Sequence, residues 1–209
     1  MSLHDDALAR LTAWTAPDAQ QEALRTRYVR HLREHPDGTS RRCRPDHLTA
    51  STVVLGAGLD VVLLTLHAKA RRWFQLGGHC EDGDATLLGA ARREATEESG
   101  VRGLRLDPVP VHLDEHEVGF CRGSDDGPDD RPVHHLDVRF LAVAAPGAEV
   151  ALSEESLDLR WWPLAALEDG SVGDASLVEL VRRGLERAQS PTWSSGGGSS
   201  WVAADQPSR

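Results

Sequence analysis

The chain has 209 residues, a hydrophobic content of 40% and a formal net charge of -10 at pH 7. This length accommodates one sizeable domain with an extension, and the negative charge argues against a nucleic-acid partner held by basic patches. No apolar run is long enough to span a bilayer, and the N-terminus lacks the basic and apolar regions of a secretory signal. Three widely spaced cysteines do not suggest a disulfide framework. We therefore expect a cytoplasmic protein with no membrane partner and no stable nucleic-acid partner.

Residues 1–46 are predicted to form a helical N-terminal extension. A short helix is expected around residues 5–14, and a second helix begins at Pro17 and Asp18, which suit a first turn. In the second helix Leu24, Tyr28 and Leu32 recur every four residues and form an apolar stripe. Such a stripe favours a packing role over a substrate-specificity cap. The following loop carries Arg41, Arg42 and Arg44, which are either solvated or bind phosphate.

Residues 47–189 are predicted to form the main domain, which begins with strands. Residues 49–55 and 60–66 are rich in Val, Leu and Thr, and the glycines at 56 and 58 indicate a hairpin turn between them. A strand at Trp73 and Phe74 then leads into a glycine turn and a helix. The helix begins at Asp84 or Thr86 and ends at Gly100. Three cations precede this strand and are either solvated or meet phosphate; they are Lys69, Arg71 and Arg72.

The second half of the chain alternates strands, a polar loop and helices. One or two strands are expected over residues 104–118, a loop over 122–132 and a strong strand over 133–143. In the strong strand one face is polar, and this row is either exposed to solvent or lines a polar cavity, with a small preference for the cavity; it comprises Val133, His135, Asp137 and Arg139. A strand over 157–162 precedes helices over 163–167 and 174–188. Residues 190–209 are predicted to be a disordered tail, although Trp193 and Trp201 are unusual for a linker and could dock on a neighbour.

Carboxylates cluster on the helix that follows the glycine turn. Glu94, Glu97 and Glu98 are spaced i, i+3 and i+4 and lie on one helix face. Their repulsion destabilises the helix unless a cation neutralises it, and hard divalent ions such as Mg²⁺ and Mn²⁺ prefer oxygen ligands. The alternative is a solvated acidic face in which Arg93 and Glu97 form an ordinary i,i+4 ion pair.

The segment from Gly78 to Val101 resembles the Nudix box, whose second half it matches in full as Arg93-Glu94-Ala95-Thr96-Glu97-Glu98-Ser99-Gly100-Val101. Two departures occur in the first half. Asp84 stands where the family has Glu, and eight residues rather than seven separate it from Arg93, which suggests a loop longer by one residue. The Trp-any-Leu-Pro-Gly-Gly sequence that precedes the box in the family is present here as Trp73-Phe74-Gln75-Leu76-Gly77-Gly78.

The resemblance implies an α+β fold, a Nudix-type α/β/α sandwich with a mixed central sheet. It also implies a metal-dependent hydrolase that cleaves a pyrophosphate bond in a nucleoside diphosphate linked to another moiety. The implied ligands of Mg²⁺ or Mn²⁺ are Glu94, Glu97, Glu98 and the backbone of Gly78, and the implied catalytic residues are Glu97, Glu98 and Arg93. In this family the general base varies, and the sequence offers Glu115, Glu117, Glu154 and Glu155.

Other functions have weaker support in the residues. The alternatives are a non-catalytic Nudix domain that senses a nucleotide and an enzyme similar to isopentenyl-diphosphate isomerase, for which no matching cysteine motif is present. His79, Cys80, His134 and His135 lack the spacing typical of zinc sites, and packing or pocket-lining roles are favoured. No Gly-x-Ser-x-Gly turn is present. The expected partner is a small nucleotide-type molecule, and a homodimer through the N-terminal helices or a sheet edge is compatible with the sequence.

Overall fold

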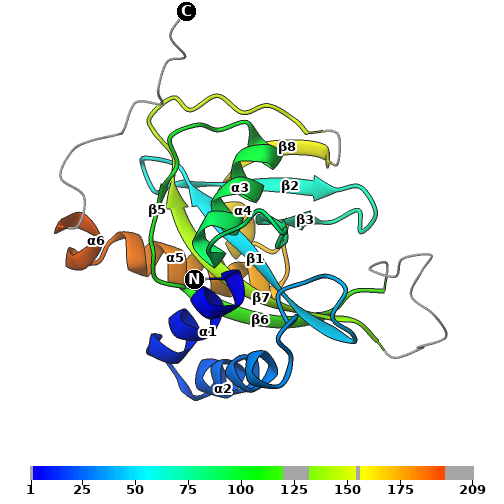
Figure 1. The fold of residues 1–209 in the computed structure, drawn as a ribbon. Coiled ribbons are helices and arrows are strands. Elements are labelled where there is room, and N and C mark those ends of the chain that lie inside the picture. The colour runs from blue at the N-terminus through cyan, green and yellow to red at the C-terminus, as the bar shows by residue number, and fades with distance from the viewer. Residues whose placement is uncertain (1, 120–131, 154–155, 196–209) are drawn as a thin grey trace, which may run out of the picture.

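The computed structural model describes residues 2–119, 132–153 and 156–195. The helices in these ranges are α1 Leu3–Ala13, α2 Ala19–Glu34, α3 Leu87–Ser99, α4 Ala165–Glu168, α5 Ala175–Ala188 and α6 Pro191–Ser195. The strands are β1 Asp46–Leu55, β2 Val61–His67, β3 Trp73–Phe74, β4 Leu76–His79, β5 Arg105–Leu106, β6 His112–Glu117, β7 His134–Val143 and β8 Ser156–Pro163. Figure 1 shows the strands as one curled sheet with helices on both sides. Within the described ranges, no helix has both the length and the apolarity needed to cross a bilayer.

The two longest strands, β1 and β7, form the centre of a mixed sheet. They pair in parallel over their whole length, from Asp46 opposite His134 to Leu55 opposite Val143. All other pairings are antiparallel: β2 and β4 add to β1, β5 and β6 add to β7, and β3 and β8 add to β2. The β1–β2 connection is the hairpin that the glycines predicted. β1 therefore pairs with three strands: its hairpin neighbour β2, the glycine strand β4 and the distant β7.

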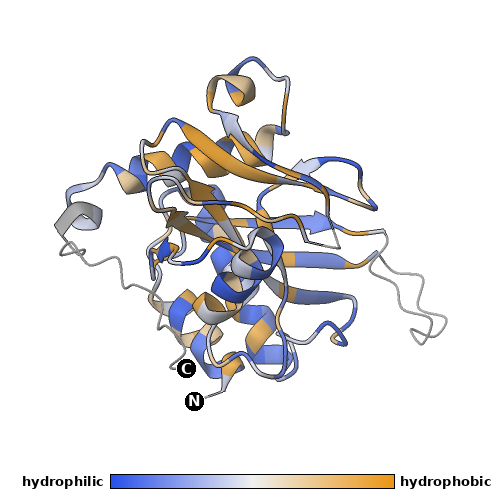
Figure 2. Ribbon diagram, turned by 90° about the horizontal axis from the view of Figure 1, so that it is seen from above, coloured by the Kyte–Doolittle hydropathy of each residue, from blue (hydrophilic) through white to orange (hydrophobic). Residues whose placement is uncertain are grey.

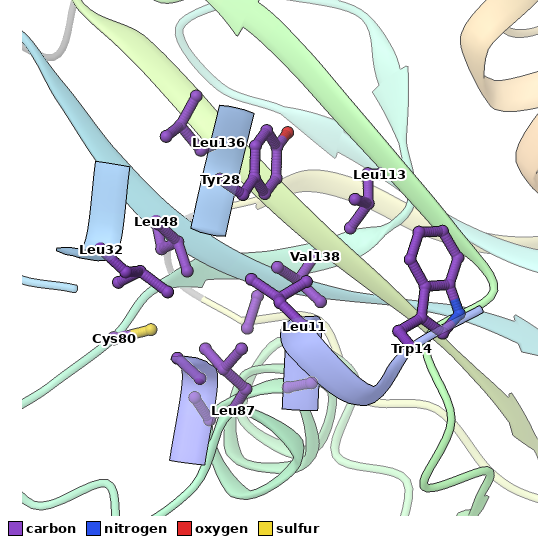
Figure 3. Close-up of a cluster of buried hydrophobic side chains, with 14 of the residues drawn as sticks. Leu11, Trp14, Tyr28, Leu32, Leu48, Cys80, Leu87, Leu113, Leu136 and Val138 are labelled. Atoms are coloured by element: carbon purple, nitrogen blue, oxygen red, sulfur yellow. The ribbon is translucent and has the colours of Figure 1, made fainter. Parts of the chain in front are cut away.

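One face of the sheet is apolar and is covered by α1, α2 and α3. Figure 3 shows the shared core, in which Leu11, Tyr28 and Leu32 from the N-terminal helices meet Leu48, Leu113, Leu136 and Val138 from the strands and Leu87 from α3. The apolar stripe predicted on the second helix thus packs on the chain's own sheet. Gln21 adds a polar link, since its side-chain amide donates to the carbonyl oxygen of Leu113 at 3.0 Å and accepts from the backbone N–H of Leu113 at 2.7 Å.

The other face of the sheet is divided between an apolar half and a polar half. Val53, Leu55, Leu141 and Val143 form the apolar half and pack under α4, α5 and α6. Figure 2 shows the matching amphipathic pattern of the helices, with orange and blue residues alternating along them. Towards the start of β1 and β7 the same face carries polar residues. They share this face with the apolar half because side chains two apart along a strand point to the same side. This second half is a buried polar layer described below.

The C-terminal segment differs from the sequence prediction. The chain forms α6 where we predicted the start of a disordered tail, and Trp193 is buried to 9% exposure in the core with α5. The guanidinium of Arg105 lies 4.0 Å from the centre of the Trp193 ring, a cation–π contact that helps to fix this helix. Trp193 therefore docks on its own chain. Residues 196–209, including Trp201, and most of the loop predicted at 122–132 lie outside the described residues.

Candidate functional site

Arg93 organises the acidic face of α3. Its Nη1 donates to Oε1 of Glu94 at 3.0 Å and to Oε2 of Glu97 at 2.9 Å, and its Nη2 donates to the carbonyl oxygen of His79 at 3.0 Å. The pair with Glu97 is the i,i+4 contact expected from the sequence. Because one guanidinium holds two carboxylates and the backbone of β4, the two glutamates are oriented together and the helix is tied to the sheet.

Asp84 occupies the position at which the family has Glu, and it pairs with Arg93. Its two carboxylate oxygens accept from Nε at 3.2 Å and from Nη2 at 3.0 Å, a forked arrangement that adds geometric specificity. These bonds to Asp84 are the main reason that the pKa of Arg93 is raised above its usual value. The longer loop therefore compensates for the shorter side chain. The helix itself is capped by Thr86, whose hydroxyl accepts from the backbone N–H of Gly89 at 2.9 Å, and ends at Gly100 as predicted.

The paired glycines of β4 lie directly against the glutamates. The backbone N–H of Gly77 donates to Oε2 of Glu98 at 2.8 Å. Gly77 has a φ of 153°, and a Cβ there would lie 2.3 Å from Cβ of Ser51, so only glycine fits. A Cβ on Gly78 would lie 2.8 Å from Oε2 of Glu94. The strand thus approaches the Glu94 carboxylate so closely that any side chain on Gly78 would displace it.

The three carboxylates share one face but do not yet converge on one point. Across the described residues, the groups of three whose ligand atoms lie within 4.8 Å of one another are His47–His79–His135 and His35–Asp37–Cys43. Glu94 and Glu97 are turned towards Arg93, and Glu98 is turned towards the backbone of Gly77. Glu97 is 60% exposed at its side chain and leaves its contact with Arg93 more easily than Glu94, which is 16% exposed. A cation shared by the set would require side-chain rotation, chiefly of the exposed Glu97.

The N-terminal extension also positions α3. Asp6 of α1 is buried, and its Oδ2 accepts from the backbone N–H of Leu87 at 2.9 Å. That N–H is one of the donors that a helix leaves unsatisfied at its N-terminus, where negative charge is favourable. The sequence pattern gave no sign of this contact, because the two residues are 81 positions apart.

The polar row on β7 is buried and paired. Asp137 and Arg139 are 3% and 4% exposed, and Nε of Arg139 donates to Oδ2 of Asp137 at 2.8 Å. Ser51 and Thr49 of β1 donate to the same carboxylate at 2.7 and 3.1 Å. Nη2 of Arg139 reaches Asp114 at 2.9 Å. These residues satisfy one another, so this part of the row is a buried network and is neither solvent-exposed nor an open cavity wall.

The candidates for a general base divide between the described and the undescribed residues. Glu115 accepts two hydrogen bonds from Arg27 of α2, at 2.6 and 2.7 Å. Its carboxylate is therefore paired with the N-terminal extension. Glu117 is exposed at the end of β6. Glu154 and Glu155 lie outside the described residues.

One cation that could have met phosphate and two cysteines that could have been nucleophiles are engaged or buried in the structure. Arg72 pairs with Asp174 at 2.9 Å. Cys43 and Cys80 are buried and not bonded to each other. Burial raises the pKa of each thiol to about 12, which argues against a nucleophilic thiolate.

Comparison with known proteins decides the family. The family model of the NUDIX domain matches residues 45–181, more than half of the chain. The chain belongs to the Nudix family. It is thus a Nudix pyrophosphohydrolase, an enzyme acting on phosphoanhydride bonds, and the predicted fold class is confirmed. A search of curated proteins finds no match.

Solved structures of Nudix proteins are similar to this chain. A Nudix-family hydrolase from Clostridium perfringens is 25% identical with a TM-score of 0.52, and the alignment covers 68% of this chain and 98% of that one. The E. coli dihydroneopterin triphosphate pyrophosphohydrolase is 18% identical with a TM-score of 0.53, over 69% and 97% of the two chains. The Nudix domain of Shewanella oneidensis NrtR, solved with ADP ribose, is 18% identical with a TM-score of 0.53, over 72% and 93%. At 18% identity the last two likenesses concern the fold.

Proposed function

We propose that this Nudix protein is a metal-dependent hydrolase of a nucleoside diphosphate linked to another moiety and that it cleaves a pyrophosphate bond. The observation that carries the proposal is the arrangement around Arg93, which gathers Glu94, Glu97 and the backbone of β4 next to Glu98. The proposed partner is a small nucleotide-type molecule.

The donor set fits Mg²⁺ or Mn²⁺. All candidate ligand atoms are oxygens, from Glu94, Glu97, Glu98 and the backbone of Gly78, and hard cations prefer such ligands. The absence of a side chain on Gly78 leaves the close approach to Glu94 unobstructed. When bound, the cation supplies polarisation of the phosphoryl oxygens and a more acidic attacking water.

In this proposal three residues of the chain orient the carboxylates and balance their charge. Arg93 neutralises part of the acidic face and fixes the direction of the Glu94 and Glu97 carboxylates. Asp84 holds Arg93 from the loop side. Gly77 holds Glu98 by its N–H. Together they hold the carboxylates beside the β4 turn before substrate binds, so that the rotation needed to share a cation is chiefly that of the exposed Glu97.

The test is a panel of nucleoside triphosphates, nucleotide sugars, dinucleotides and ADP-ribose-type compounds incubated with Mg²⁺, with products identified by chromatography. We expect nucleoside monophosphate or phosphate-containing products from at least one class. Glu97→Gln and Glu98→Gln are expected to reduce turnover by about 100-fold or more while the fold survives. Glu186→Gln, on the exposed face of α5, is the matched control and retains full turnover.

Two outcomes contradict the proposal. Full turnover in both glutamine variants would remove the assigned roles, and tight nucleotide binding without product would indicate the nucleotide sensor.

We also propose a cytoplasmic location for this protein. The buried free thiols of Cys43 and Cys80 support a reducing, cytoplasmic location. The apolar stripe of α2 is used inside the chain, so a homodimer would use another surface such as a sheet edge; light scattering measures the mass in solution.

A further inference from the structure

A row of four histidines crosses the sheet on the face opposite α3. The residues come from four adjacent strands: His79 from β4, His47 from β1, His135 from β7 and His116 from β6. His135 lies directly opposite both His47 and His116 in the strand register. His79 lies opposite Thr49, two positions from His47, and therefore on the same face.

Three of these imidazoles form a compact group. The ring centres of His47, His79 and His135 lie 4.9 to 5.2 Å apart, and one ring nitrogen from each lies within 4.8 Å of the others. The ring of His116 contacts that of His135 at 5.5 Å between centres. His116 is not a member of the group of three, and its Nδ1 lies 2.9 Å from Oδ2 of Asp114.

The backbone orients the central imidazole. Nδ1 of His47 lies 3.2 Å from the carbonyl oxygen of Cys43, and it is the nitrogen that donates there because a carbonyl only accepts. Nε2 of the neutral ring then carries the lone pair. A ligand histidine in metal proteins is commonly fixed in this way, by a hydrogen bond from its second nitrogen. His47 is fully buried, while His79 and His135 are partly exposed and leave access from solvent.

We propose that His47, His79 and His135 form a second metal site, which binds a borderline transition-metal ion of the Zn²⁺ class through three imidazole nitrogens. Tetrahedral zinc requires nitrogen atoms about 3.4 Å apart. The nitrogen atoms here lie within 4.8 Å of one another, so they must close by at most about 1.4 Å. Three protein ligands leave a fourth position for water or an anion.

The chemistry of the site separates it from the glutamate site. Neutral imidazole suits zinc, copper and nickel, whereas magnesium prefers oxygen. Arg41 and Arg44 place positive charge near His47 and His79, so the bonds from imidazole to the metal must outweigh this repulsion. The two sites lie on opposite faces of one strand, because Gly78 pairs with Ala50 and His79 pairs with Thr49.

The structure also corrects the combination of zinc-type residues considered from sequence. Cys80 is buried in the core on the other face with Leu48 and Leu87, and Nδ1 of His134 lies 3.0 Å from Asp46. Neither joins His79 and His135. The third member is His47, which is distant from both in sequence.

The test is equilibrium dialysis of the full chain against Zn²⁺ in a large excess of Mg²⁺, with metal content measured by mass spectrometry. We expect one zinc ion per chain. His135→Ala and His79→Gln are expected to weaken binding by about 100-fold or more, and His134→Ala, the adjacent residue on the other face, leaves it unchanged. A second readout is thermal unfolding, in which zinc raises the midpoint of the wild type and of His134→Ala but not of His135→Ala.

Three results would overturn the site. The first is no zinc on the wild-type chain, and the second is unchanged zinc binding in both His135→Ala and His79→Gln. The third is loss of zinc in Cys43→Ser with retention in His135→Ala, which would place the ion at His35, Asp37 and Cys43. Glu98→Gln serves as a further control: it retains zinc binding, so that the histidine site and the glutamate site are tested separately.

Discussion

Asp6 of α1 accepts a hydrogen bond from the backbone N–H of Leu87, 2.9 Å away at the first turn of α3. A residue near the N-terminus thereby stabilises the end of the helix that carries the glutamates. The contact is buried, which strengthens the interaction between a carboxylate and a helix N-terminus.

Asp6→Ala is therefore expected to lower the free energy of unfolding by about 1–2 kcal/mol, measured by urea denaturation. The same carboxylate pairs with Arg10 at 3.2 Å. Arg10→Ala keeps the bond to Leu87 but also removes the hydrogen bond from Arg10 to the carbonyl oxygen of Pro108 and its contact with the Phe140 ring. Arg10→Lys, which keeps a positive charge beside Asp6 and leaves the Leu87 contact untouched, serves as the control, with a smaller loss. Equal losses in the two variants would show that the helix contact contributes nothing of its own.

Gly78→Ala is expected to reduce turnover with little effect on stability. The new Cβ would lie 2.8 Å from Oε2 of Glu94, and the flexible carboxylate would move away rather than the backbone. A displacement of about 1 Å at a catalytic group can cost roughly 100-fold in rate, and we expect a loss between 10- and 100-fold. Steady-state kinetics and thermal unfolding of the same variant measure the two effects.

Gly83→Ala is the matched control for this substitution, because a Cβ there meets nothing within 4 Å. Wild-type turnover in Gly78→Ala would contradict the close approach described between β4 and Glu94.

Asp84→Asn is expected to lower turnover and to raise the Mg²⁺ concentration needed for half-maximal rate. The substitution removes the charge that holds Arg93 by two hydrogen bonds. Loss of a residue that orients metal ligands typically costs about 10- to 100-fold. The measurement is the rate as a function of Mg²⁺ concentration.

Asp82→Asn, an exposed acid in the same loop, is expected to leave the Mg²⁺ dependence unchanged. If the two asparagine variants behave alike, the positioning role of Asp84 is wrong.

The fold is expected to lose stability as pH falls from 6.5 towards 4, partly through His112. Burial, with a contribution from Arg139, lowers the pKa of this histidine from 6.5 to about 4. Between these values the unfolded chain binds the proton and the folded chain does not, so protonation favours unfolding. At pH 5 this amounts to about 1–2 kcal/mol relative to pH 7.

The measurement is urea denaturation at pH 7 and pH 5 for the wild type and for His112→Gln. The variant does not take up this proton, so we expect the difference between the two pH values to shrink. An undiminished difference would exclude His112 as a contributor.

Local patterns in the sequence predicted much of the fold. The Val, Leu and Thr runs predicted β1 and β2, and the glycines between them predicted their hairpin. The helix of the box was predicted to end at Gly100 and to start at Asp84 or Thr86, and the structure has Thr86 as the cap. These signals succeed because backbone preferences and side-chain periodicity act over a few residues.

The contacts that the sequence did not reveal are all between distant residues. His47 and His135 are brought together by the parallel pairing of β1 with β7, and a register shift of one residue would place one of them on the other face. Asp6 meets Leu87 only through tertiary packing. Trp193 lies in a segment whose composition resembles a linker, and its burial depends on Arg105 and α5. None of these pairings leaves a periodic signal.

The first two helices share their apolar core with the strands and with the helix that carries the box. A fragment starting at residue 47, chosen to isolate the catalytic part, would lose Leu11, Tyr28 and Leu32 from that core. The apolar face of the sheet would then be exposed to water, which promotes aggregation. We therefore expect that this enzyme cannot be trimmed to the part that its family model matches and that any useful shortening must start from the other end.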